Sequence, residues 1–159
     1  MYAATDPSGS RRVSGRYHRA ADMFSPASTS TSADVWEALY LALAPETCLG
    51  EMLRHLAPEV LPRLNDLRVT ELSVTLALTL DAREPERFGL PRERLWHDTG
   101  YLLPQRLAEL ALARGAEGLL VPSATRLGTN LISFPVNPQP ISALRVVGSR
   151  DPRLYVRLP

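Results

Sequence analysis

The sequence predicts an α+β fold, a compact single domain with a mixed β-sheet core. Two observations carry this prediction. The segments typical of strands gather late in the chain and do not alternate regularly with helices, as they would in a doubly wound parallel fold. The chain has 159 residues, of which 45% are hydrophobic and 22% charged, a composition that suits one globular domain with a buried core. We therefore expect residues 1–159 to form a single domain.

The first third of the chain predicts a loop, a strand and a helix. Residues 25–34 (SPASTSTSAD) are nearly all small and polar, which indicates a flexible surface loop. The apolar run at 39–43 predicts a buried strand. A helix should begin at Pro45, because proline is favoured at the first helical position, and it should end before Pro58. Its apolar side chains recur at helical spacing, at Leu49, Met52, Leu53 and Leu56.

The rest of the chain predicts one long strand, a second helix and further strands. Residues 69–80 (VTELSVTLALTL) alternate apolar and polar side chains, which predicts a half-buried, antiparallel strand. Residues 81–94 are charged and predict a loop. A helix is expected over 104–114, with an apolar stripe at Leu103, Leu107 and Leu110 and with Gly115 as its left-handed cap. Short apolar segments predict strands at 118–122, 130–134, 143–147 and 154–157, with a turn at 148–152.

Composition and charge argue against several classes of protein. No apolar run reaches the length of about 18 residues that a transmembrane helix needs, and the polar N-terminus does not resemble a signal peptide. The single cysteine, Cys48, cannot form an internal disulfide, so we expect a cytoplasmic protein. A net charge of +1 does not favour direct nucleic-acid binding. All 18 basic residues are arginines, whose planar forks grip carboxylate or phosphate through two bonds.

Three polar segments could carry chemistry, although each also has a plainer interpretation. Residues 15–19 (GRYHR) suit a phosphate-bearing ligand with a flat ring, or form a solvated basic turn. Glu51 lies nearly opposite the apolar stripe of its helix, on one face with Cys48 and His55, and either faces solvent or lines a cleft. Residues 121–130 (VPSATRLGTN) form either a ligand-contacting loop or a simple connector. Motifs for nucleotide phosphate loops, zinc sites and serine-hydrolase elbows are absent from the sequence.

Taken in order, these segments resemble the RES domain, a family named for an Arg, a Glu and a Ser. The resemblance rests on GRYH (15–18), LYLALAPETCLGEMLRH (39–55) and GAEGLLVPSATRLGTNLISF (115–134), and it covers roughly residues 11–150. Tyr17 stands where the family usually has Trp, and residues 25–34 resemble an insertion. An additional family Arg near the first strand has only Tyr2 or Arg11 as a counterpart. Arg16, Tyr40, Glu51 and Ser123 match the family's principal residues, and His55 and Asn130 match two secondary positions.

The resemblance implies a compact α+β fold like that of ADP-ribosyltransferase toxins. It also implies a toxin of a toxin–antitoxin pair that cleaves NAD at the nicotinamide–ribose bond, by phosphorolysis or by hydrolysis. The expected partner is an Xre-like antitoxin that blocks the active site. An ADP-ribosyltransferase acting on a protein, and a non-catalytic NAD-binding or antitoxin-binding module, remain as alternatives. No tightly bound cofactor and no metal are expected, because NAD is the substrate and inorganic phosphate a possible co-substrate.

The resemblance also suggests a role for each matching residue. Glu51 would stabilise the oxocarbenium-like transition state that forms as neutral nicotinamide leaves. Arg16 would bind the pyrophosphate or the attacking phosphate, and Tyr40 would pack against nicotinamide or orient the ribose. Ser123 would act with these three as a catalytic residue. The NAD-binding residues would be Arg16, Tyr17, Tyr40, His55, Ser123 and Asn130, with Arg19 and Arg126 as further cations of low rank.

Overall fold

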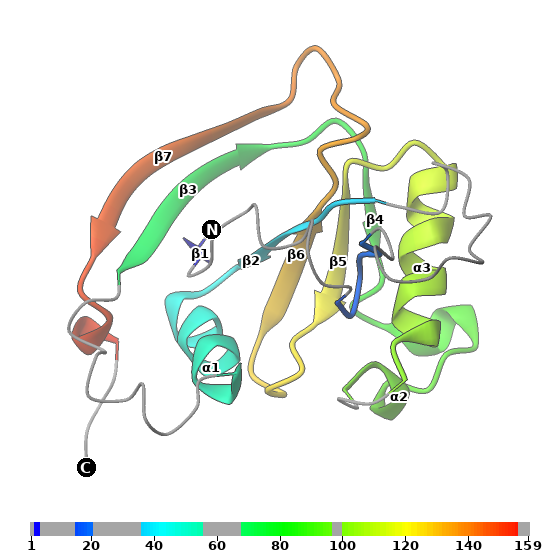
Figure 1. Cartoon of the computed structure of the whole chain (residues 1–159), viewed down its shortest axis with the longest axis horizontal. Helices are drawn as coiled ribbons and strands as arrows, with labels where there is room; N and C mark the ends of the chain where they lie inside the picture. Colours follow the sequence, from blue (N-terminus) through cyan, green and yellow to red (C-terminus); the bar gives the residue numbers. More distant parts are fainter. Residues whose placement is uncertain (1, 4–14, 21–35, 56–67, 97–99, 156–159) are drawn as a thin grey trace, which may run out of the picture.

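The computed structural model describes residues 2–3, 15–20, 36–55, 68–96 and 100–155, which build one mixed sheet with helices beside it (Figure 1). The seven strands are ordered β4-β5-β6-β2-β1-β3-β7. All neighbouring strands are antiparallel except β4 and β5, which are parallel. The predicted α+β class and mixed sheet are thus confirmed. The strands are β1 (Tyr2–Ala3), β2 (Leu39–Ala42), β3 (Val69–Thr75), β4 (Thr79–Asp81), β5 (Gly118–Pro122), β6 (Thr129–Ser133) and β7 (Ala143–Arg150).

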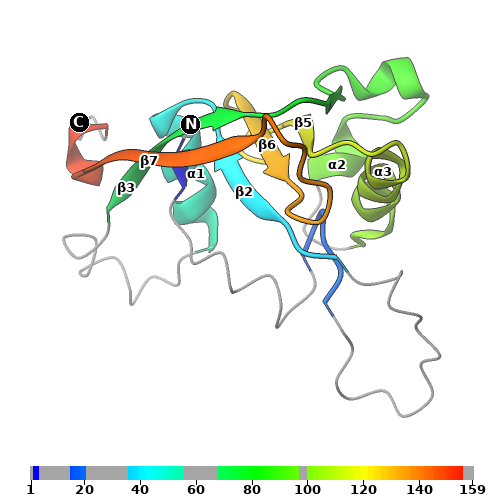
Figure 2. The same cartoon turned by 90° about the horizontal axis from the view of Figure 1, so that it is seen from above.

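Two longer helices contact different parts of this sheet. Helix α1 (Pro45–His55) contacts β1, β2 and β3, whereas α3 (Leu102–Ala113) contacts β5 and the short helix α2 (Glu93–Trp96). Both views show α2 and α3 together at the β4–β5 end of the sheet (Figure 2). None of the helices in the described ranges is long and apolar enough to cross a membrane.

The main core lies where α3 meets β5 and β6. Leu107, Ala108 and Ala111 of α3 are buried there, one stripe of the helix, while the predicted stripe residue Leu110 is 37% exposed. Gly115 ends the helix region with a φ of 73°, the left-handed geometry predicted for it. Tyr17 and Trp36 bury their rings in the same cluster, so the Arg16-bearing segment is anchored on this core. The sheet contributes Leu119, Val121 and Ile132 to the cluster.

The single strand predicted over 69–80 is wrong, because the structure has two strands there. β3 pairs antiparallel with β1 and β7 near one edge of the sheet, and β4 pairs parallel with β5 at the other edge. The break between them is held by a residue distant in sequence. The Glu117 carboxylate accepts hydrogen bonds from the backbone N–H groups of Ala77, at 2.5 Å, and Leu78, at 3.3 Å. Glu117 thereby satisfies two donors that a continuous strand would have paired with a neighbouring strand.

Two other predictions near the C-terminus are also corrected. The turn expected at 148–152 is partly strand, because β7 continues to Arg150. Of the strand expected at 154–157, Leu154 ends a 3₁₀ turn, η5 (Pro152–Leu154), and residues 156–157 lie outside the described residues. The Arg153 backbone N–H at the start of this turn donates to Asp151 Oδ1. The charged segment 81–94, expected as a loop, contains the 3₁₀ turn η4 (Pro85–Phe88) and the start of α2.

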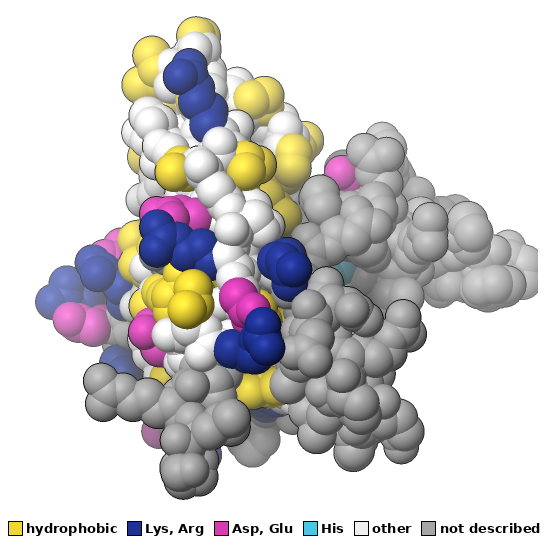
Figure 3. Space-filling view, turned by 90° about the vertical axis from the view of Figure 1, so that its left-hand side faces the viewer, with side chains coloured by type: hydrophobic (Ala, Val, Ile, Leu, Met, Phe, Trp, Pro, Cys, Tyr) yellow, Lys and Arg dark blue, Asp and Glu magenta, His cyan; other side chains and the backbone are white. Residues whose placement is uncertain are grey.

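Strand β7 forms an exposed edge of the sheet. It extends with β3 as a long curved ribbon, and apolar side chains lie among charged ones on the side of the molecule seen in Figure 3. Val146 and Val147 are 69% and 62% exposed. The register shifts between Glu71 and Leu72 of β3, a bulge-type irregularity that interrupts the ladder. Such irregularities discourage another strand from pairing with an open edge.

Strand β1 is a further element that the sequence did not predict. It is two residues long, yet it pairs with both β2 and β3 and so joins the two parts of the sheet. The loop predicted at 25–34, and Arg11, lie outside the described residues.

Candidate active site

Glu51 is positioned by α1, which begins at Pro45 as predicted and carries Glu46 in its first turn. Leu49 is buried against Ala42 and Val69, and this contact fixes the helix on the sheet. Cys48 was predicted to share the face of Glu51. That prediction is wrong, because Cys48 is buried in the same cluster as Leu49, and burial raises the pKa of its thiol to about 11.

Two other predictions for this helix have different outcomes. Leu53, expected in the apolar stripe, is 39% exposed, whereas Cys48 is buried, so the buried face of α1 is shifted from the predicted stripe. The side chain of His55 and the whole of Leu56 lie outside the described part of the chain.

Three donors converge on one oxygen of the half-buried Glu51 side chain. Its Oε1 accepts hydrogen bonds from Ser123 Oγ at 2.7 Å, from the Ala124 backbone N–H at 2.9 Å and from Asn130 Nδ2 at 2.7 Å. All three donors are uncharged. Within the described residues, the hydrogen bonds of this carboxylate end on Oε1, and no arginine forms an ion pair with it. The carboxylate is therefore held in place by donors that bring no positive charge to it.

The loop between β5 and β6 carries two of these donors, Ser123 and Ala124. Ser123 is fully buried, and its backbone N–H donates to Gly128 O at 3.1 Å, which closes the loop. The Ser123 hydroxyl also bonds the Thr125 hydroxyl at 2.6 Å and accepts from the Thr125 N–H at 3.1 Å. Asn130 stands on β6, in register with Ala42 of β2. The site thus combines a rigid strand position with a loop that is hydrogen-bonded to itself.

Two glycines allow this loop to approach α1 closely. Gly128 has a φ of 78°, and a Cβ there would lie 2.3 Å from Thr47 Oγ1 of the helix. A Cβ on Gly50 would lie 3.2 Å from Thr125 Cγ2. Any larger residue at Gly128 would therefore separate the loop from the helix that carries Glu51.

Tyr40 connects the sheet to the Arg16-bearing turn. Its hydroxyl accepts a hydrogen bond from the Tyr17 backbone N–H at 2.8 Å and lies 2.9 Å from His18 Nδ1. Burial is the main reason why the pKa of Tyr40 is raised well above its ordinary value, and Tyr17 is affected in the same way. Both phenols are neutral at physiological pH. The charges of Arg16 and Glu51 also act on the pKa of both rings, which places these groups in one neighbourhood.

Arg16 is held at the end of helix α2. Its guanidinium donates through Nη1 to the carbonyl oxygen of Leu95, and it lies 5.7 Å from the ring centroid of Tyr101. The turn that carries Arg16 is fixed from α3 as well, because Gln105 Nε2 donates to Gly15 O at 3.0 Å and to His18 O at 3.2 Å. The arginine therefore extends from a turn held on several sides.

Comparison with known proteins places this geometry in a family. The family model of the RES domain matches residues 1–156. The chain belongs to the RES domain family. Its structure is similar to a chain in the crystal structure of the M. tuberculosis MbcT–MbcA toxin–antitoxin complex, with a TM-score of 0.69 and 24% sequence identity over 98% of this chain and 84% of that chain. No curated protein sequence matches the chain significantly.

In this RES domain, several residues predicted from the sequence come together. Ser123 and Asn130 both donate hydrogen bonds to Glu51, although 72 and 79 positions separate the acid from these partners. Arg16, Tyr17 and Tyr40 form a second group, linked by the hydrogen bond from Tyr17 to Tyr40. Arg19, proposed as a further cation, instead forms an ion pair with Glu109 at 2.9 Å and stacks on Trp36.

Other parts of the RES site were missed by sequence reasoning. The Ala124 N–H is a backbone donor and leaves no signal in the sequence. Gln105 lies in a segment interpreted only as helix, and Leu95 lies just beyond the predicted loop at 81–94, so their contacts to the Arg16 turn were not foreseeable. The described residues contain no group of three or more His, Cys, Asp or Glu side chains that could hold a metal ion.

Proposed function

We propose that this RES domain cleaves NAD at the bond between nicotinamide and ribose. The observation that carries the proposal is the Glu51 carboxylate, which is fixed by three neutral donors on one oxygen. Cleavage of this bond sends the bonding electron pair to the nicotinamide nitrogen, so that nicotinamide leaves neutral and positive charge develops on the ribose. A fixed carboxylate without a cationic partner can stabilise that charge through Oε2, and nicotinamide needs no general acid.

The other site residues bind and position the dinucleotide in this proposal. Arg16 binds its pyrophosphate, a bidentate interaction for which the guanidinium fork is suited. Tyr40 keeps the Arg16 turn in place, because its hydroxyl is engaged by the Tyr17 N–H and by His18. The Tyr17 hydroxyl and Asn130 Oδ1 are buried and have no hydrogen-bond partner among the described residues. Such atoms are uncommon in proteins, and they suit a ligand rich in hydroxyl and amide groups.

The ribosyl cation is then captured by an oxygen nucleophile. Attack by water forms a bond to the ribose carbon, releases one proton and yields ADP-ribose. Attack by inorganic phosphate yields ADP-ribose 1″-phosphate. The same site residues would act in both reactions. Whether water or phosphate attacks depends on the supply of inorganic phosphate.

We also propose that the chain is the toxin of a toxin–antitoxin pair. The support is its membership of the RES family and its likeness to a chain of a solved toxin–antitoxin complex. Unrestrained cleavage of cytoplasmic NAD would arrest growth, so a partner that covers Glu51 and Arg16 would be required. An Xre-like antitoxin is the partner we expect. Co-purification of the chain with the product of a neighbouring gene, and loss of nicotinamide release in that complex, would test this.

Substitution of Glu51 tests the proposed chemistry directly. Glu51→Gln keeps the shape of the side chain and removes its charge, and we expect nicotinamide release from NAD to fall by about 10²–10³. Glu46→Gln is the matched control, because Glu46 is an exposed acid of the same helix. Both variants should melt like the parent protein. Undiminished turnover in Glu51→Gln would refute the role of the carboxylate.

A further inference from the structure

Arg126 has an unusual backbone conformation in the loop that holds Glu51. It is the only non-glycine residue with a positive φ, 65°, in the described part of the chain. Its N–H donates to Ser123 O at 3.0 Å, so the strained position lies in the same tight turn as the Ser123 hydroxyl. Left-handed conformations of non-glycine residues carry a cost and tend to occur at functional sites.

Trp96 holds the side chain of Arg126 in place. The Arg126 guanidinium lies 5.1 Å from the centre of the Trp96 ring, a cation–π arrangement. Trp96 is in turn fixed to the helix of Glu51, because its carbonyl oxygen accepts a hydrogen bond from Arg54 Nη2 at 3.0 Å. Arg54 follows Glu51 by three residues on α1. Trp96 therefore connects the loop, through its ring, with the helix, through its carbonyl oxygen, and these two elements form the Glu51 site.

The charge of Arg126 is not neutralised by the protein groups that the structure describes. Its side chain is exposed, and no carboxylate of the described residues forms an ion pair with it. Three other exposed arginines do have carboxylate partners: Arg83 with Asp81, Arg150 with Glu71 and Arg153 with Asp151. A guanidinium that is oriented by an aromatic ring but lacks a carboxylate can accept an external anion.

We infer that Arg126, stacked on Trp96, is a phosphate-binding residue of the Glu51 site. The inference rests on the proposed function and deepens it. Two sources offer the same phosphate chemistry there, namely the pyrophosphate of NAD and an inorganic phosphate that attacks the ribose. Arg16 also contacts this short helix, through Leu95 O, so two arginine side chains contact neighbouring residues at the end of α2. Two guanidinium groups there can bind phosphate groups of one ligand or of two.

The test compares Arg126→Asn with the parent chain. Asparagine accepts the left-handed conformation more readily than most residues, so the loop should keep its shape while the cation is lost. Trp96→Leu removes the ring and leaves Arg126 in place. Arg145→Ala is the matched control, because Arg145 is an exposed arginine of β7 for which no carboxylate partner is found in the described chain. Thermal melting checks that each variant folds.

Steady-state rates of nicotinamide release, with NAD and phosphate varied separately, distinguish the two sources. A KM for inorganic phosphate raised roughly tenfold or more in Arg126→Asn, with the KM for NAD unchanged, assigns Arg126 to the attacking phosphate. A similar rise in the KM for NAD, also in phosphate-free buffer, assigns it to the pyrophosphate. Trp96→Leu should change the same constant in the same direction by a smaller factor. Unchanged constants in Arg126→Asn, or equal changes in Arg145→Ala, would overturn the inference.

Binding measurements separate failure of this inference from failure of the proposed function. If the parent chain releases no nicotinamide, the proposed function fails, and calorimetry with ADP-ribose and with inorganic phosphate decides the role of Arg126 by itself. Weaker binding of either compound to Arg126→Asn than to the parent and to Arg145→Ala supports the inference. Equal binding to all three chains, or no binding to the parent, rejects it.

Discussion

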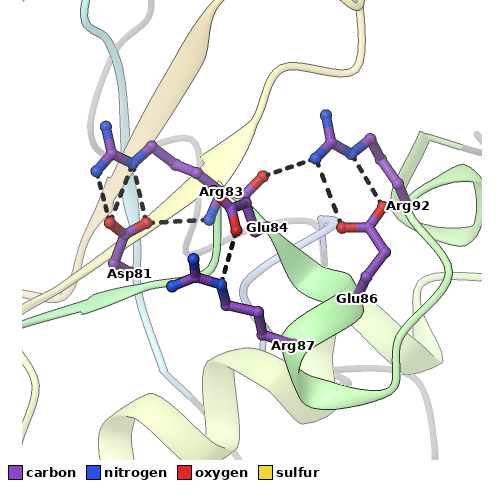
Figure 4. A network of polar contacts seen from close by, with 6 residues as sticks. All are labelled: Asp81, Arg83, Glu84, Glu86, Arg87 and Arg92. Carbon is purple, nitrogen blue, oxygen red and sulfur yellow. Dashed lines mark hydrogen bonds and ion pairs between the residues drawn. The ribbon is translucent and has the colours of Figure 1, made fainter.

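Two groups of acidic side chains in this molecule differ in how their charge is treated. In the exposed segment from Asp81 to Arg92, each carboxylate has an arginine partner: Asp81 with Arg83, Glu84 with Arg87 and Glu86 with Arg92 (Figure 4). At the Glu51 site, the carboxylate accepts three hydrogen bonds from uncharged donors.

The difference shows which of the two groups can stabilise a positive charge on a bound substrate. Hydrogen bonding from Arg83 lowers the pKa of Asp81, and the opposite charges there largely cancel. Neutral donors orient Glu51 just as firmly but leave a net negative charge beside the Arg16 turn. A fixed, uncompensated charge is what a cationic transition state requires. An ion-paired carboxylate at the surface serves solubility and little else.

The largest expected effect concerns cells that produce the chain. If Glu51 and not the exposed acids supplies the catalytic charge, induction of the parent chain should lower total NAD before growth stops. Glu51→Gln should do neither. Glu86→Gln should behave like the parent, because Glu86 forms only an ion pair with Arg92 at the surface. NAD extracted over time, beside a cell count, is the measurement. Arrest at a constant NAD level would exclude NAD depletion and favour modification of a protein target.

The next effect concerns the donors to Glu51. Ser123→Ala and Asn130→Leu each remove one hydrogen bond to the charged oxygen, and we expect kcat to fall roughly tenfold to a hundredfold in each. Thr125→Val is the control, since its hydroxyl bonds Ser123 but not the carboxylate. A full rate in both Ser123→Ala and Asn130→Leu would mean that the position of Glu51 does not depend on these donors.

A further carboxylate, Glu117, sharpens this comparison between ion-paired acids and acids with neutral donors. Glu117 is buried and accepts from Ser142, from the Gln139 N–H and from the Ala77 and Leu78 N–H groups, all neutral donors. These bonds, that of Ser142 foremost, lower its pKa. Because the folded-state pKa lies below the unfolded one, the stabilisation is present above about pH 4.5 and is lost as pH falls through the folded pKa.

Thermal melts of Glu117→Gln against the parent chain check this behaviour. We expect the variant to melt at a lower temperature at neutral pH, and the gap between the two should close in acid. Ser142→Ala should produce a smaller gap with the same pH dependence. A gap that is constant from pH 7 to pH 3 would contradict the proposed contribution of the charge.

The smallest effect is expected in the exposed network. Arg92→Ala removes the partner of Glu86, and exposed pairs of this kind often contribute nothing measurable to stability. The melting temperature should stay within experimental error of the parent value, with and without added salt. A clear loss of stability at low salt alone would show that the network acts as a cooperative unit.

Much of this structure was predictable where a local pattern decides the outcome. The helical spacing and the proline start gave α1, and the apolar runs gave β2 and β5. The motifs around Glu51, Ser123 and Asn130 identified residues that the fold brings into contact. The helix and strand predictions succeeded because each depends on side chains within one short segment, whereas the site residues were identified by the order of the family motifs.

The failures occurred where a distant residue decides the outcome. The alternation over 69–80 is equally good on both sides of residue 77, and only Glu117, far along the chain, ends one strand and lets the next begin. Cys48 was misplaced because a helical wheel does not show how wide a buried face will be. The role of Gln105 could not be predicted, because it depends on two backbone carbonyl groups of the turn at Gly15–His18, and backbone groups have no sequence signal.

The separation in sequence between Glu51 and its donors has a consequence for the timing of activity during synthesis. Ala124 and Asn130 follow the acid by 73 and 79 residues, and β2 finds its partner β6 only after most of the chain has been made. Contacts of such long range form late in folding. A ribosome-bound chain that ends before β5 therefore carries the acid without any of its hydrogen-bond donors. If Glu51 supplies the catalytic charge as proposed, a product terminated before β5 would be inert, and activity would begin only once the C-terminal half has emerged and closed the sheet.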